Sequence, residues 1–130
     1  MTRVLLDTNT YAAFCSGDRR VLDILAGADA VYLSVIVLGE LYAGFRGGGR
    51  RQENERILNE FLAKPTVSSL LLTIETAEIF GEIKDRLKRA GTPIPINDVW
   101  LAAQAVETGS VLVSYDAHFR RVTGLRLWGS

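Results

Sequence analysis

Short, uninterrupted apolar runs recur along the chain and alternate with longer segments that have the periodicity of helices. Each run is continuous rather than alternating, which is typical of parallel strands covered on both faces. We therefore expect strands at Val4–Asp7, Ala30–Leu33, Val67–Leu71 and Val111–Ser114, and a weaker fifth at Leu125–Trp128.

The segments between these runs carry helix signals, such as Ser34, a good N-cap, and Asn97 in the same role. The expected helices span Asn9–Ser16, Arg19–Ala26, Val35–Phe45, Gln52–Lys64, Thr76–Ala90 and Asp98–Thr108. Strands alternating with helices predict an α/β fold, a three-layer sandwich with a central, mainly parallel five-stranded sheet. With 130 residues, we expect 1–130 to form a single domain.

Composition limits the class of protein. Because 48% of the residues are hydrophobic, a packed core is expected and disorder is not. No run approaches the roughly 18 to 20 apolar residues of a membrane span, and the N-terminus does not resemble a secretory signal. A single cysteine, Cys15, excludes an internal disulfide and fits the cytoplasm; we interpret it as a residue that fills space rather than a nucleophile.

Four acidic residues lie in otherwise apolar sequence near predicted strand ends or helix starts: Asp7, Glu40, Asp98 and Asp116. Sites in parallel sheets form beyond the carboxyl ends of the strands, where Asp7 would project. Asp98 and Asp116 each have an ordinary alternative, as a helix-start residue and a turn residue. Glu40 would lie near the buried side of its helix and would need a partner there.

If the four carboxylates converged to about 5 Å, each pair would repel by roughly 3 kcal/mol at an effective dielectric constant of about 20. We see no lone histidine or scattered lysine in these segments that offsets the repulsion, whereas a divalent cation would. Oxygen ligands without a Cys or His cluster favour Mg²⁺ or Mn²⁺ over Zn²⁺. Such a site suits phosphoryl transfer.

Four motifs carry a family resemblance, in order and across the whole chain. They are DTN at Asp7–Asn9, the S-x₅-E of Ser34–Glu40, NDVWLAA around Asp98 and SYDAHF around Asp116. No single motif is specific, but together they resemble a PIN domain, and more closely the VapC-type ribonuclease toxins of prokaryotic toxin–antitoxin pairs.

The resemblance implies an endoribonuclease that hydrolyses RNA phosphodiester bonds by metal-activated water and leaves a 5′-phosphate and a 3′-hydroxyl. Asp7, Glu40, Asp98 and Asp116 would be catalytic, and Asp7, Asp98 and Asp116 would bind Mg²⁺ or Mn²⁺. Glu40 would complete the site, on a second ion or on the attacking water. The expected supporting residues are Thr8, Asn9, Ser34, Asn97 and Ser114, the last where the family often has a threonine before the fourth acid.

The resemblance also implies partners. A cognate VapB-like antitoxin would wrap the protein and insert an arginine or lysine into the acidic pocket. Tyr42 and Phe45 either line its groove or lie in the interior. Toxins of this family commonly form homodimers, so we expect a dimer, and no association with a membrane.

The chain has 15 basic and 15 acidic residues, a balance that argues against a general nucleic-acid binder. Once the four pocket acids are set aside, however, 15 basic residues face 11 acidic ones. In RGGGRR (46–51), Arg50 and Arg51 would either clamp RNA or a partner, or flank a solvated turn. We interpret Lys84–Arg89 as the wet face of a helix, His118 as a partly exposed turn residue, and Trp100 as a packing residue.

Two rival functions remain. A haloacid dehalogenase-like phosphatase would need a second acid two positions after Asp7, where this chain has Asn9, and an RNase H-like chain would begin with antiparallel strands. A catalytically silent RNA-binding module on the same fold is the alternative from another class. The repulsive set of four acids argues against it, because a silent domain has no reason to keep such a set.

Overall fold

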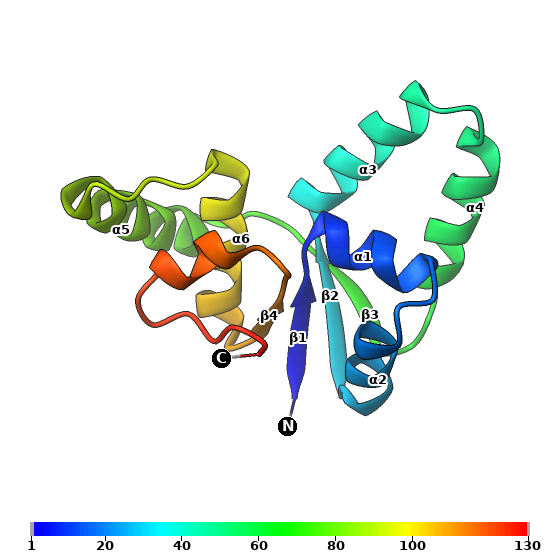
Figure 1. Cartoon of the computed structure of the whole chain (residues 1–130), viewed down its shortest axis with the longest axis horizontal. Coiled ribbons are helices and arrows are strands. Elements are labelled where there is room, and N and C mark those ends of the chain that lie inside the picture. Colours follow the sequence, from blue (N-terminus) through cyan, green and yellow to red (C-terminus); the bar gives the residue numbers. More distant parts are fainter. Residues whose placement is uncertain (1, 130) are drawn as a thin grey trace.

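The computed structural model describes residues 2–129, and its centre is a parallel sheet in the order β3-β2-β1-β4 (Figure 1). The strands are β1 (Arg3–Leu6), β2 (Ala30–Ser34), β3 (Val67–Leu70) and β4 (Val111–Val113). Val4 of β1 pairs with Val31 of β2 on one side and with Val111 of β4 on the other. The parallel α/β prediction is confirmed.

The predicted fifth strand is wrong. Within residues 2–129 the sheet has four strands, and the segment Leu125–Trp128 makes only an isolated parallel bridge between Leu127 and Leu112. Two backbone hydrogen bonds hold it, from Leu112 N to Arg126 O at 2.8 Å and from Trp128 N to Leu112 O at 3.0 Å. Glycines with positive φ lie on both sides, Gly124 at 84° and Gly129 at 84°, and they turn the chain away before a strand can extend.

All six predicted helices are present within the described residues, with ends shifted by a few positions. They are α1 (Thr8–Cys15), α2 (Arg19–Gly27), α3 (Val35–Gly47), α4 (Arg51–Leu62), α5 (Ile74–Ala90) and α6 (Ile96–Thr108), followed by a 3₁₀ helix η1 (Ala117–Arg121). Asn97 does not cap α6, contrary to the prediction. Pro95 is the N-cap, and its carbonyl accepts from Asp98 N at 3.0 Å and from Val99 N at 3.2 Å.

Helices α5 and α6 lie beside β4, and α1 to α4 lie on the β2–β3 side (Figure 1). The core between them contains fully buried side chains of the strands and of α6, such as Leu5, Leu33 and Leu101. Trp100 stacks on Phe80 with 3.9 Å between ring centroids, which confirms its packing role between α6 and α5. Cys15, in contrast, is exposed at the end of α1 and fills no space in the core.

Polar side chains follow β1 and β4 at one edge of the sheet. Asp7 follows β1 directly and Ser114 follows β4, one residue earlier than the strand ends that we predicted. Since β1 and β4 are parallel neighbours, both side chains emerge at the same edge. Within residues 2–129, no helix has the length and apolar character of a membrane span.

Candidate active site

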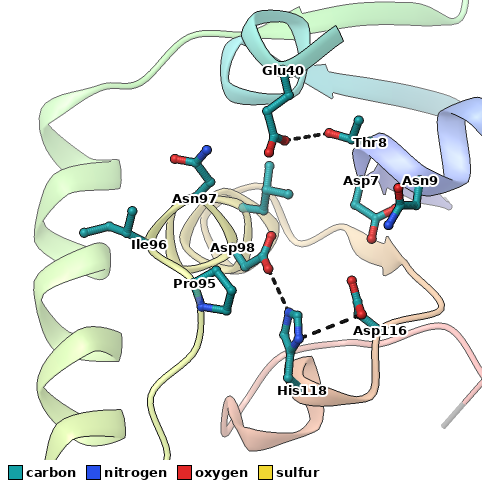
Figure 2. Close-up of a pocket in the computed structure, with 11 residues that line it drawn as sticks. Asp7, Thr8, Asn9, Glu40, Pro95, Ile96, Asn97, Asp98, Asp116 and His118 are labelled. Atoms are coloured by element: carbon teal, nitrogen blue, oxygen red, sulfur yellow. Dashed lines mark hydrogen bonds and ion pairs between the residues drawn. The ribbon is translucent and has the colours of Figure 1, made fainter. Parts of the chain in front are cut away.

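All four predicted acids line one pocket of about 430 Å³, at the carboxyl ends of β1 and β4 (Figure 2). Asp7 comes from the β1–α1 junction, Glu40 from α3, Asp98 from the first turn of α6, and Asp116 from the residue before η1. The remaining lining residues are Thr8, Asn9, Pro95, Ile96, Asn97, Leu101 and His118. Residues more than one hundred positions apart therefore meet at one spot.

Asp7 is the buried member of the set, with 5% of its surface exposed. It caps α1, and its Oδ1 accepts from Thr10 N at 2.9 Å, while the Ser114 hydroxyl donates to Oδ2. The Thr10 hydroxyl lies 2.8 Å from both Asp7 Oδ1 and Val113 O, and can donate its one proton to either. The carboxylate is thus held in one orientation by Thr10 of α1 and by Ser114 at the end of β4.

Thr10 is a site residue that our sequence reasoning missed. Its backbone N–H and hydroxyl complete a capping box with Asp7, because Asp7 N donates to Thr10 Oγ1 at 3.1 Å. The signal was present in the sequence, since a hydroxyl residue three positions after an N-cap aspartate is the spacing that a capping box requires. Ser114, in contrast, was among the predicted supporting residues. Its hydroxyl donates to Asp7, and its Oγ also accepts from Asp116 N at 3.0 Å.

Glu40 has the partner that we expected, but not the burial. Thr8 Oγ1 donates to Glu40 Oε1 at 2.6 Å, so the predicted supporting role of Thr8 is directed at Glu40 (Figure 2). The expectation that Glu40 lies on the buried side of its helix is wrong, because the side chain is exposed. Helix α3 turns Val37 and Leu41 into the core, and this rotation leaves Glu40 at the rim of the pocket.

A histidine lies between the other two acids. His118 Nε2 is 2.8 Å from Asp98 Oδ2, and its Nδ1 is 3.9 Å from Asp116 Oδ1 (Figure 2). Our expectation that no histidine offsets the repulsion is therefore wrong. The chain enters η1 directly after Asp116, and this turn folds His118 back over the pocket, where 22% of its side chain is exposed.

The ordinary alternatives for the two acids are also decided by geometry. Asp116 precedes η1 but makes no side-chain capping bond to it, so its carboxylate does not serve as a turn cap. Asp98 lies in the first turn of α6, where an acid offsets the helix dipole, yet its carboxylate faces the pocket and binds His118 (Figure 2). Both carboxylates are thus available to the pocket.

Burial raises the pKa of Asp98 above its ordinary value. The hydrogen bond and the charge of His118 lower that pKa, while the carboxylates of Asp116 and Glu40 raise it. The raising effects prevail. Ionised Asp98 therefore lies in surroundings that disfavour its charge, as expected at a functional site.

Replacing this charge should stabilise the protein. With the folded pKa above the unfolded one, native Asp98 loses stability as the pH rises through that window. In a chelator, we expect Asp98→Asn to melt a few degrees above the parent at about pH 7, the shift that about 1 kcal/mol gives in a domain of this size. The gain should shrink at about pH 3.5, just below the ordinary aspartate pKa, because most of the parent is then neutral at position 98 as the variant is. Calorimetric melting at the two pH values measures it; a variant that is less stable at neutral pH would refute the charge argument.

The five remaining predicted residues take different places. Asn9 and Asn97 line the pocket. Ser34 is buried and caps α3, with its Oγ accepting from Ile36 N at 3.0 Å, so it supports the helix that carries Glu40 without lining the pocket. Arg50 and Arg51 lie at the α3–α4 connection and pair with neighbours on α4, Glu53 at 3.8 Å and Glu55 at 3.4 Å. The structure does not bring these arginines into the acidic pocket.

The donor set fits a hard divalent cation, since the pocket offers carboxylate oxygens from four residues. Within residues 2–129, however, no three His, Cys, Asp or Glu side chains stand in a finished metal-binding group. His118 lies between Asp98 and Asp116, and the hydroxyls of Thr10 and Ser114 occupy part of Asp7. The chemistry of the residues fits Mg²⁺ or Mn²⁺, and binding either ion would require the side chains of Asp98 and Asp116 to move.

The sequence matches the PIN domain family over residues 4–125, and the chain belongs to this family. Ribonuclease VapC2 of Haemophilus influenzae is 34% identical over 131 positions, which cover 97% of this chain and 96% of the relative.

Solved structures show the same relationship. The chain is similar to one in the crystal structure of VapBC2 from Rickettsia felis bound to a DNA fragment from its promoter, with a TM-score of 0.83, 27% identity and 97% coverage of both chains. It is also similar to one in DNA-bound VapBC from Salmonella typhimurium, with a TM-score of 0.83 and 26% identity over 98% of this chain and 97% of that one. The resemblance to VapC proteins therefore extends over nearly the whole fold.

Proposed function

We propose that this protein is a metal-dependent endoribonuclease, the toxin of a VapBC-type pair, and that it acts in the cytoplasm. The observation that carries the proposal is the convergence of Asp7, Glu40, Asp98 and Asp116 on one pocket. Relatives across nearly the full length are named ribonucleases, which supports the choice of RNA as substrate. The fixed orientation of buried Asp7 supports catalysis over simple RNA binding, because a silent module needs no such carboxylate.

Asp7, Asp98 and Asp116 would hold Mg²⁺ or Mn²⁺. When bound, the cation supplies positive charge that activates water and stabilises the charge developing on the phosphate. Thr10 and Ser114 keep Asp7 in place before the substrate arrives. His118 donates from Nε2 to Asp98 and so orients the second carboxylate. Such preorganised charges contribute to catalysis because they need not rearrange during the reaction.

Glu40 would accept the proton of the attacking water. Its Oε1 accepts from Thr8 (Figure 2), and no side chain among residues 2–129 donates to its Oε2. Hydrolysis would then break the bond between phosphorus and the 3′ oxygen and leave a 5′-phosphate.

We further propose that a VapB-like antitoxin inhibits this site with an arginine or lysine. Within residues 2–129, none of the side chains lining the pocket is an arginine or lysine, so four carboxylates face one histidine. A guanidinium pairs well with carboxylates in such surroundings. Tyr42 is 37% exposed on α3 and lies edge-on to Phe45 at 6.2 Å, so this pair offers an apolar contact on the helix of Glu40.

A homodimer would bury Leu71 and Ile74, which are 71% and 77% exposed.

The proposal predicts cleavage of cellular RNA that depends on a divalent cation. Purified protein should produce new RNA 5′ ends in Mg²⁺ or Mn²⁺, and these should accept an adaptor that requires a 5′-phosphate. Excess chelator should abolish the ends, because the carboxylates alone cannot neutralise the transition state. RNA binding without new ends in either cation would favour the silent module, and cleavage that persists in the chelator would refute metal dependence.

A further inference from the structure

A second cavity adjoins the acidic pocket. Its volume is about 210 Å³, and it is lined by Lys84, Leu87, Lys88, Pro93, Ile94 and Val99. Ile94 lines this cavity and Pro95 lines the acidic pocket, so consecutive residues, about 3.8 Å apart at Cα, separate the two. On α6, Asp98 likewise lines the acidic pocket and its neighbour Val99 lines the second cavity. The 93–99 segment is therefore a shared wall.

The chemistry of the second cavity is opposite to that of the first. Its floor is apolar and well packed, with Leu87 4%, Ile94 9% and Val99 1% exposed. Within residues 2–129, the ammonium groups of Lys84 and Lys88 make no hydrogen bond and no ion pair. Arg89, on the same helix, is instead paired with Asp85 at 3.1 Å. The two ammonium groups thus stand at the rim with no acidic partner.

The rim on the other side is held in place. Arg121 of η1 donates to Pro93 O at 2.9 Å, and Thr92 N donates to Leu87 O at 3.0 Å. These bonds join the loop before α6 to α5 and to the segment that carries His118. The cavity therefore shares the 93–99 segment with the acidic pocket, and these bonds fix α5 relative to that segment.

We propose that this cavity binds the nucleotide next to the scissile phosphate of single-stranded RNA. Lys84 and Lys88 contact its phosphate, and the apolar floor receives the face of its base or ribose. The proposal rests on the function proposed above, because that function defines which phosphate is the scissile one. The proposal also gives part of Lys84–Arg89 a role in binding RNA. The wet helix face that we predicted is confirmed, but two of its lysines border a cavity.

The test is binding of a labelled single-stranded RNA oligonucleotide to full-length protein in chelator, where cleavage is blocked, across a series of salt concentrations. Lys84→Ala/Lys88→Ala should weaken binding about tenfold and lower the slope of log affinity against log salt by about 1.4, the value for two phosphate contacts on a single strand. Arg89→Ala is the matched control, since it removes one positive charge from the same helix outside the cavity. Its affinity should stay within about twofold of the parent.

The outcomes separate the two proposals. Unchanged affinity and slope in the double variant, or an equal loss in Arg89→Ala, would overturn the nucleotide site even if the parent cleaves RNA. A selective loss in the double variant supports the site. If that loss occurs while the parent yields no new RNA ends in Mg²⁺ or Mn²⁺, the proposed catalysis fails and the RNA-binding cavity stands. Tighter binding of a duplex than of its single strand would refute the contact with an unpaired base.

Discussion

Asp7→Asn is expected to lower the rate of RNA cleavage by at least about 10³-fold, or about 4 kcal/mol of transition-state stabilisation, while the protein stays folded. The substitution removes the one buried negative charge of the pocket and keeps its shape. Asparagine is as good an N-cap as aspartate, so its oxygen can still accept from Thr10 N. Its amide can donate to the Ser114 hydroxyl, which now acts as acceptor.

Single-turnover cleavage of a fluorogenic RNA measures this prediction, with circular dichroism to confirm the fold. Asp23→Asn is the matched control, because Asp23 is an exposed acid on α2 away from the pocket. It should cleave at the parental rate. A folded Asp7→Asn protein that retains more than about a tenth of the parental rate would contradict the assignment of Asp7.

Phe119→Ala is expected to cost about 3–5 kcal/mol of the free energy of unfolding, the usual cost of deleting a buried aromatic ring. Phe119 is 1% exposed and is the buried residue of η1, the turn that carries His118. Its ring lies 4.8 Å from the His118 ring, between centroids. The cavity left by the deletion would therefore loosen the segment that places His118 and Asp116 at the pocket.

Denaturation in urea measures the loss, with the slope of the transition checked for constancy. Phe119→Leu keeps most of the buried volume and should cost clearly less than the alanine variant. A loss below about 1 kcal/mol for Phe119→Ala would show that η1 is not anchored by this ring.

The strand–helix alternation was sufficient to predict the parallel sheet and all six helices, because continuous apolar runs have few other uses in a chain of this size. The fifth strand failed for a local reason. The run Leu125–Trp128 is apolar, but pairing is limited to the bridge at Leu127 by the turns at Gly124 and Gly129. A run of apolar residues does not by itself show where the chain turns away from the sheet.

The four acids were predictable because each stands near a strand end or a helix start in apolar surroundings. The exposure of Glu40 was not, since it depends on how α3 rotates Val37 and Leu41 into the core. The contact of His118 with Asp98 depends on a 3₁₀ turn that has no periodic signal in five residues. Arg50 and Arg51 were proposed from charge and glycine content, and neither property reports distance from the pocket.

The central claim is that these separated carboxylates bind one kind of hard cation at a common site. Calorimetric titration of Mn²⁺ into the RNA-free protein tests it most directly, with Asp7→Asn and Asp23→Asn titrated alongside. We predict binding to the parent and to Asp23→Asn with equal affinity, and a loss of at least about tenfold in Asp7→Asn, because one charged ligand is removed. Equal Mn²⁺ affinity in all three proteins, or no binding to the parent, would contradict it.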